Sequence, residues 1–427
     1  MLNHIKKSDF IGGLTTFFTM SYIVVVNPSI LSTTGTGMSF SGVMTATVLL
    51  CFFLTLLMGI YAKLPFAVAP GMGINAFFTY SIILGRGIPW PTALGMVFWS
   101  GVLFLLVSIT PLREQIARAI PASIRIASAG GIGIFLSFIG LQNAHFLEAD
   151  PVTLVHLGKL DHRAGLGILG LAVIVLLARR KNPLAFLAGI LTVSAGAALF
   201  GKIDAPKDVF SLPDFESVFL KLDLLGSLKP ALIPAIISIL FTDLFDSLST
   251  LIGVSHATGL VDERGEPKNL RQGLIVDSLA TLLAGPFGTS AGTAYIESSA
   301  GIEAGGRSGM ASVVTAICFL PCLFLAPVLG LIPSYATAPV LLMVGAMMFR
   351  SVLGLKLSEP EELIPAFLTL ILIPLTFSIT QGILWGLFSY VVLNLLSGKR
   401  KILSPMLIGI GILSGILLLM ESGFTLP

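Results

Sequence analysis

Four carboxyl groups lie in long apolar stretches of the sequence, where ionisable side chains are rare and usually functional. Asp243 and Asp246 stand three residues apart, so a helix would place both on one face. Asp277 and Glu297 occupy the two following stretches, and none of the four has a neighbouring Lys or Arg in the sequence. Because a carboxyl group in a low-dielectric setting favours its neutral form, these acids are candidates for protonation and for proton coupling.

Two of the apolar stretches are interrupted by Pro and Gly, at Ala69–Ala76 and at Gly285–Glu297. Both begin with Pro and Gly, are shorter than a full span, and hold corresponding positions in the two halves of the chain. Such pairs point to a transporter's binding site, because irregular backbone at membrane depth must line protein or a wet cavity. We therefore favour a functional role for the acids over the alternative, in which protonated carboxyls only hydrogen-bond neighbouring helices.

Asn75 follows the glycines of the first interrupted stretch, and its amide offers both donor and acceptor to a ligand. Capping of a half-helix is the other role open to it, and one side chain can serve both. Gly71 and Gly73, like Gly288 and Gly292, would let the backbone approach a ligand closely, although tight helix packing explains each of them equally well.

The elements that must position these residues are membrane-spanning helices. Of the 427 residues, 55% are hydrophobic and only 11% are charged, compared with roughly 25% charged in soluble domains. The apolar runs are continuous rather than alternating, which favours helices and excludes a barrel. The net charge of +3 is too small to indicate a nucleic-acid partner, and the three cysteines lie in apolar stretches as inert residues. No metal or cofactor motif is found, so we expect neither.

Fifteen apolar runs follow one another along the chain, and a polar connection at 202–229 divides them into halves. The first seven and the next seven have similar length patterns, which predicts an all-α polytopic membrane protein with two repeats. The final run has three interpretations. It is a separate span, an interfacial segment, or a sign that one helix earlier in the chain has been counted as two runs. The runs lie at about 11–31, 42–62, 69–85, 92–111, 121–141, 164–180, 183–201, 231–254, 271–285, 290–303, 308–331, 335–351, 361–377, 379–397 and 403–421.

Basic residues are distributed unequally between the two sides of this layout. With the N-terminus in the cytoplasm, 18 lie on the cytoplasmic side and 7 outside, which satisfies the positive-inside rule. Seven spans per half is an odd number, so the second repeat must be inverted relative to the first. We therefore expect a multi-pass protein of the cell inner (plasma) membrane with a cytoplasmic N-terminus.

Five segments carry a family resemblance: Gly12–Tyr22, Gly71–Phe78, Asp243–Asp246, Tyr295–Ser298 and Ala304–Gly309. Together they resemble the AzgA-like purine permeases of the nucleobase–cation symporter superfamily, over nearly the whole chain. The resemblance implies about fourteen membrane segments in two inverted repeats of seven, with the third and tenth segments part strand and part helix. It also implies proton-coupled uptake of adenine, guanine or hypoxanthine.

The resemblance assigns roles to individual residues. Its substrate-binding positions correspond here to Asn75, Asp243 and Glu297. The segment Gly288–Ala294 is less threonine-rich than the family pattern, which leaves the preferred purine open. The chemistry agrees, because the N–H groups and acceptors on a purine edge can pair with carboxylates, an amide and strand backbone.

The resemblance also implies an elevator-like movement of a core domain against a gate domain. Asp246 matches an acid needed for transport and is expected to couple the proton, while Gly73, together with Gly71, serves the conformational change. Expected partners are a purine nucleobase, protons and the lipid bilayer, and a homodimer is one assembly open to the protein. The boundaries are 1–111 and 230–331 for the core, and 112–229 and 332–427 for the gate.

An anion permease on the same fold, such as a sulfate or bicarbonate carrier, is the alternative function, because half-helix N-termini suit anions. Three acids around the site argue against it, since they would repel an anionic substrate. An intramembrane enzyme would need a nucleophile or a metal set, which the sequence does not offer. A passive channel would not need titratable groups.

The charge asymmetry makes a prediction about sidedness. In a background with the native cysteines replaced by serine, a cysteine at position 159 should react with an impermeant maleimide added to intact cells, whereas one at position 181 should not. Both should react after the membrane is permeabilised. The reverse pattern in intact cells would invert the layout.

Overall fold

The computed structural model describes residues 6–110, 119–202, 208–263, 267–355, 357–399 and 403–421. The expected domain boundary at 111–112 lies outside these ranges. So do seven of the basic residues counted for the topology: Arg113, Arg118, Lys207, Arg264, Lys356, Arg400 and Lys401.

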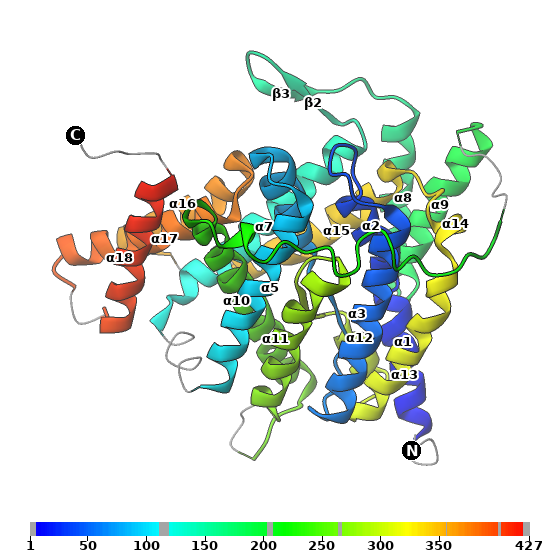
Figure 1. The fold of residues 1–427 in the computed structure, drawn as a ribbon, viewed down its shortest axis with the longest axis horizontal. Coiled ribbons are helices and arrows are strands. Elements are labelled where there is room, and N and C mark those ends of the chain that lie inside the picture. The colour runs from blue at the N-terminus through cyan, green and yellow to red at the C-terminus, as the bar shows by residue number, and fades with distance from the viewer. Residues whose placement is uncertain are drawn as a thin grey trace.

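The chain is folded mainly into helices, with four short strands among the described residues (Figure 1). The first half contains α1 (Lys7–Met20), α2 (Ile23–Leu31), α3 (Phe40–Ile60), β1 (Val68–Pro70), α4 (Met72–Ala76), the π-helix η2 (Phe77–Gly85), α5 (Trp90–Ile109), α7 (Ala122–Asn143), β2 (Leu147–Asp150), β3 (Leu154–Leu157), α8 (His162–Arg179) and α9 (Ala185–Leu199). The second half contains η3 (Gly226–Leu228), η4 (Pro230–Leu232), α10 (Ile233–Thr258), α11 (Leu270–Phe287), β4 (Gly292–Ala294), α12 (Ser298–Glu303), α13 (Gly309–Phe319), η5 (Leu320–Phe324), α14 (Ala326–Leu329), η6 (Ser334–Thr337), α15 (Ala338–Phe349), η7 (Arg350–Gly354), α16 (Pro360–Thr376), α17 (Ile379–Leu396) and α18 (Pro405–Glu421).

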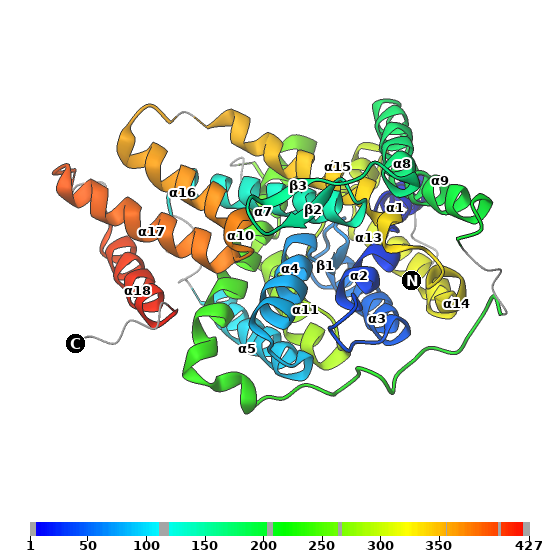
Figure 2. The ribbon, with the colours of Figure 1, turned by 90° about the horizontal axis from the view of Figure 1, so that it is seen from above.

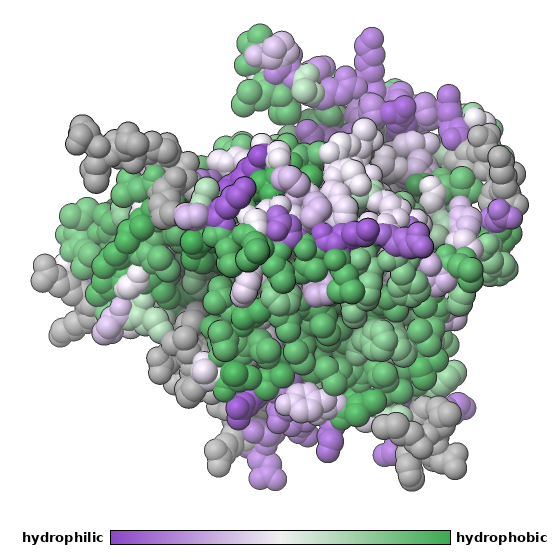
Figure 3. Space-filling model, viewed as in Figure 1, coloured by the Kyte–Doolittle hydropathy of each residue, from purple (hydrophilic) through white to green (hydrophobic). Residues whose placement is uncertain are grey.

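The helices have the length and composition of membrane spans. Eight helical stretches within the described ranges are long and apolar enough to cross a bilayer, and several shorter apolar helices accompany them. A broad apolar band separates polar upper and lower ends of the molecule (Figure 3). The expected class, a polytopic helical membrane protein, is confirmed, and the final run of the sequence forms a helix, α18, which packs on α17.

The tenth segment does not begin where the sequence predicted. The residues Gly285–Phe287 form the last turn of α11, and Pro286 lies inside that helix. The fixed φ of proline suits a helix, so the residue removes one hydrogen bond without ending it. The helix ends at Gly288, whose φ of +92° is one that glycine adopts readily, and its N–H bonds to the carbonyl of Ala284 at 3.0 Å.

The helices pack as two groups, seen as two layers from above (Figure 2). The first group comprises α1–α5 and α10–α13, and the second comprises α7–α9 and α15–α18. The division of the chain into a core and a gate, and the movement of one against the other, stay predictions. One part differs, because the connection at 208–229, expected in the gate, packs against α3 and α5 of the first group.

Asp214 fixes this connection to the start of α3. Its carboxylate accepts hydrogen bonds from Ser41 at 2.7 Å and from Ser217 at 2.5 Å. Burial alone would raise the pKa of Asp214, but these hydrogen bonds outweigh it and lower the pKa to about 2. The carboxylate therefore stays ionised, and the connection stays attached, throughout the physiological pH range.

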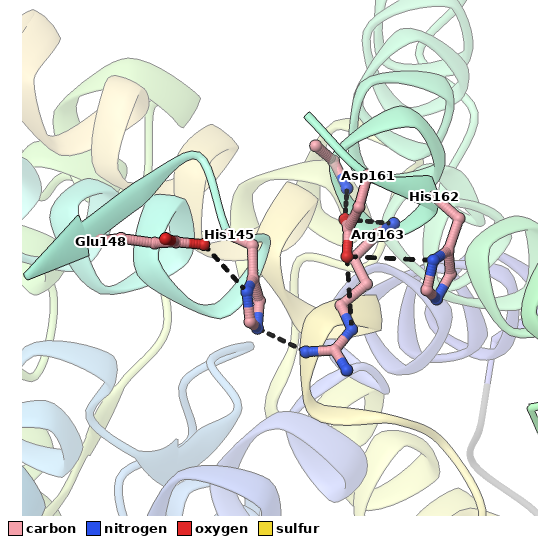
Figure 4. A network of polar contacts seen from close by, with 6 residues as sticks. His145, Glu148, Asp161, His162 and Arg163 are labelled. Carbon is pink, nitrogen blue, oxygen red and sulfur yellow. Dashed lines mark hydrogen bonds and ion pairs between the residues drawn. The ribbon is translucent and has the colours of Figure 1, made fainter. Parts of the chain in front are cut away.

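A hairpin of β2 and β3 projects from the end of the molecule opposite to the start of α1, and the sequence did not predict it (Figure 1). A polar network lies at its base (Figure 4). Arg163 bonds to His145 at 2.5 Å, and His145 in turn lies 3.5 Å from Glu148. Asp161 caps α8 by accepting from the N–H groups of Arg163 and Ala164.

Close packing within the first group leads to a prediction at Gly101. A Cβ there would lie 2.3 Å from the backbone nitrogen of Leu282 on α11, so Gly101→Ala must force α5 and α11 apart. Overpacking of this kind costs about 1–3 kcal/mol and should lower the thermal unfolding midpoint in detergent. Gly165→Ala is the control, since a Cβ there meets nothing within 4 Å. Equal midpoints for the two variants would contradict the packing.

Candidate functional site

Two short strands from opposite halves of the chain meet at the centre of the first group. β1 pairs with β4 in antiparallel register, with Val68 opposite Ala294 and Pro70 opposite Gly292. The N–H of Gly71 extends the pairing by donating to the carbonyl of Ala291 at 2.9 Å. This mutual pairing satisfies irregular backbone at membrane depth. The part-strand, part-helix form implied for the third and tenth segments is confirmed, because α4 follows β1 and α12 follows β4.

A cavity of about 270 Å³ lies where these strands face the second helix group. The wall is largely apolar, and two thioethers line it from the second group. The first group contributes Tyr22, Met72, Gly73, Asp246, Ser249, Thr250 and Thr293–Glu297, and the second contributes Ala129, Val344, Met347, Met348 and Ser351.

Glu297 is one of two acids on the wall of this cavity. The residue is 8% exposed and stands at the N-cap of α12, three residues after the end of β4. The hydroxyl of Tyr22 donates to its Oε1 at 2.7 Å. The ring of Tyr22 also contacts Phe186 of α9, with ring centroids 4.9 Å apart. Tyr22 therefore fixes the carboxylate and touches the second group at the same time.

Asp246 is the other acid on the cavity wall. The residue belongs to α10 and is partly exposed, whereas its neighbour Asp243, one turn earlier, is fully buried. The structure thus brings Asp246 and Glu297 together around one space, from α10 and from the end of β4. An ionisable group that faces a cavity can exchange protons with any water in it.

Asp243 lies behind the strands, in a reciprocal contact between α10 and α11. Thr281 of α11 donates to Asp243 of α10, and Ser247 of α10 donates to Asp277 of α11. Ser247 also lies 3.2 Å from the hydroxyl of Thr293 in β4. Both acids are fully buried, so this clasp joins two helices and a strand. Asp243 does not line the cavity in this conformation.

Asn75 also lies away from the cavity wall. It is completely buried in α4, and its side-chain oxygen accepts a hydrogen bond from Ser290, just before β4. The amide therefore joins the half-helix of one repeat to the strand of the other. Of the three residues predicted to contact substrate, only Glu297 faces the cavity in this conformation.

The two glycines lie where backbone is close to other elements. A Cβ on Gly73 would lie 2.4 Å from Cγ2 of Ile132, on α7 of the second group. A Cβ on Gly71 would lie 3.1 Å from Cγ2 of Thr293 in β4. Gly73 therefore permits close contact between the two helix groups.

Sequence reasoning missed several residues of the cavity, above all Tyr22, Met347 and Met348. Tyr22 lies in one of the segments that carry the family resemblance, but its hydrogen bond to Glu297 spans 275 residues. No local pattern could place the two together. Within the described ranges, no group of three or more His, Cys, Asp and Glu side chains is arranged to hold a metal ion.

A cavity that two packed helix groups share, beside paired interruptions from inverted repeats, is the arrangement of a secondary membrane transporter rather than an enzyme. Comparison of the sequence gives the relationship directly. The model of the permease family, of the xanthine/uracil type, matches residues 7–385, and the chain belongs to this family.

Individual relatives agree with this assignment. The adenine permease AdeP of Escherichia coli (strain K12) is 40% identical over 408 residues, covering 95% of this chain and 91% of that protein. The guanine/hypoxanthine permease PbuO of Bacillus subtilis (strain 168) is 39% identical over 417 residues, covering 95% of this chain and 96% of that protein. The resemblance to purine permeases inferred from the motifs is confirmed.

The fold has solved counterparts as well. The transmembrane domain of the cyanobacterium bicarbonate transporter BicA superposes with a TM-score of 0.67 and covers 89% of this chain and 97% of that one. Its sequence identity is 16%, so it establishes the shared fold.

Proposed function

We propose that this protein imports purine nucleobases, such as adenine, guanine or hypoxanthine, together with protons. The relatives that are 40% and 39% identical are permeases for adenine and for guanine and hypoxanthine. The observation that carries the proposal is the carboxylate of Glu297, held by Tyr22 on the wall of a largely apolar cavity. A flat, neutral, hydrogen-bonding ring suits such a space.

The chemistry of recognition follows from the lining. The free lone pairs of Glu297 can accept from ring N–H groups of a purine. Thioethers of Met72, Met347 and Met348 and the ring of Tyr295 offer polarizable and aromatic surface to the ring faces. Both helix groups contribute to this wall, so bound substrate would contact the core and the gate.

Proton coupling is assigned to Asp246, which faces the same cavity. The core, formed by the first helix group, would carry substrate and proton past the gate, formed by the second. The close contact of Gly73 with Ile132 lies on this boundary. Asp243 and Asn75, which hold α10, α11 and the strands in place, support the site in this conformation.

An anionic substrate fits this cavity poorly. Asp246 and Glu297 both stand on its wall, and no Lys or Arg is among its lining residues. Two acids would repel an anion when ionised. Competition of labelled adenine uptake by unlabelled purines and by sulfate or bicarbonate distinguishes the two functions, and we expect competition by purines alone.

The binding role of Glu297 makes a first prediction. Glu297→Gln should reduce adenine uptake to background in cells that lack their own carriers, while the protein still reaches the membrane. Tyr22→Phe removes a hydrogen bond to a charged group, which is worth about 1.5–3 kcal/mol, so the Kd for adenine should rise roughly 10- to 100-fold. Tyr61→Phe is the matched control, because Tyr61 is 48% exposed. Normal uptake by a well-expressed Glu297→Gln variant would sink the site assignment.

The coupling role of Asp246 makes a second prediction. Asp246→Asn imitates a permanently protonated carboxyl, so uphill accumulation of adenine in proteoliposomes with an imposed pH gradient should stop. Exchange of internal for external adenine should survive, since exchange does not require release of the proton. Accumulation by Asp246→Asn, or full accumulation driven by a sodium gradient alone, would refute proton coupling at this residue.

A further inference from the structure

A second, smaller cavity of about 40 Å³ adjoins the substrate cavity. We call it the side chamber. Its lining shares Ala129, Asp246, Ser249 and Met348 with the larger cavity. Asp246 therefore stands on the partition between the two spaces and is open to both. The side chamber reaches further along α7, where its lining includes Arg125.

Two polar atoms in the lining of the side chamber are buried without a hydrogen-bond partner among the described residues. They are Nε of Arg125, on α7, and Oγ1 of Thr242, on α10. An unsatisfied buried donor or acceptor costs about 1–3 kcal/mol, so such atoms normally bond to water. A volume of about 40 Å³ exceeds the roughly 10–15 Å³ that one water needs. The chamber therefore has both the space and the partners for water.

The position of Arg125 is not explained by its own helix. It lies in the first turn of α7, where the helix dipole disfavours a positive charge. A basic residue that only marks the cytoplasmic side would keep its polar atoms in solvent, yet Nε is buried. The carboxyl group of Asp246 lines the same chamber, and it is a group on which the positive charge of Arg125 can act.

The other titratable groups around Asp246 are all acids. Glu297, Tyr22 and Tyr295 face it across the substrate cavity, while Asp243 lies one turn away on α10 and Asp277 on the adjacent α11. Among the lining residues of the two cavities, Arg125 is the one cation. A nearby positive charge favours the ionised form of a carboxyl group, whereas nearby acids favour the protonated form. Arg125 is thus the one cation that shares a cavity wall with Asp246.

We propose that the side chamber is a water-filled exit path for the coupled proton, and that Arg125 promotes release of the proton from Asp246 into it. This inference rests on the proposed function. The O–H bond of Asp246 breaks, the proton passes to a chamber water as hydronium and onward to bulk water, and the carboxylate left behind is stabilised by the guanidinium. Substrate enters and leaves through the larger cavity, so proton and purine use different spaces. Arg125 is a positioning residue, since it acts through Asp246.

The test uses adenine and purified full-length protein in proteoliposomes. Arg125→Gln should bind adenine and exchange it as the wild type does, but lose about tenfold or more of its uphill accumulation, because a change of one pKa unit changes the equilibrium for proton release tenfold. Raising the pH on the release side, with the outside pH raised equally so that the gradient stays constant, should restore accumulation in Arg125→Gln, an effect that a purely structural role would not produce. Arg125→Lys should retain most of the accumulation. Arg180→Gln, an exposed arginine next to α8, is the control and should behave as the wild type.

A second variant tests the water in the chamber. Thr242→Val keeps the shape of the side chain and removes the hydroxyl, so it should slow accumulation without weakening adenine binding. Accumulation by Arg125→Gln equal to that of the wild type would overturn the inference and leave the proposed function standing. Loss of adenine binding and exchange in Arg125→Gln, with no recovery at alkaline release-side pH, would also overturn it. If the wild type itself neither exchanges nor accumulates any purine, the proposed function fails, and the inference with it.

Discussion

Backbone N–H and C=O groups at membrane depth must find partners within the protein, because lipid offers none. The antiparallel pairing of β1 with β4 meets this requirement at the one place where the third and tenth segments leave the helical conformation. The pairing also determines where the residues next to β4 lie. Glu297 stands just beyond β4. Asn75 accepts a hydrogen bond from Ser290, two residues before β4, and Thr293 within β4 lies beside Ser247 in the clasp of α10 and α11. Without the paired strands, the acids would have no common space to face.

The sequence predicted the class, the spans and the two interruptions because each depends on local composition. Continuous apolar runs require helices in lipid, and clusters of Pro and Gly indicate where a span is interrupted. Asp246 and Glu297 were recognisable in the same way, as acids in apolar surroundings. Local patterns fail where function depends on distance in space. The hydroxyl that orients Glu297 comes from Tyr22, and the sequence around either residue gives no sign that the two are in contact.

Spacing also misled in one respect. Asp243 and Asp246 share a helix face only approximately, and one turn of α10 is enough to separate a buried structural contact from the wall of a cavity. The tenth segment shows a similar limit, since Pro286 was taken for its start although proline is tolerated inside α11. A proline signals a lost hydrogen bond, and only the surrounding packing decides whether the helix ends there. The β2–β3 hairpin was missed because its strands are short and follow no clear alternation.

The pairing of β1 with β4 also has a consequence for synthesis of the protein, because the two strands leave the ribosome at different times. The N–H of Ala67, beside β1, donates to the hydroxyl of Ser298, and these two residues are 231 positions apart. At about 5–20 residues per second, β1 waits roughly 10 to 50 seconds for its partner to leave the ribosome. Throughout that interval, a stretch of unpaired backbone has to be sheltered from lipid by water, by the insertion machinery or by neighbouring helices. Half of the chain, expressed alone, would keep that exposed edge permanently.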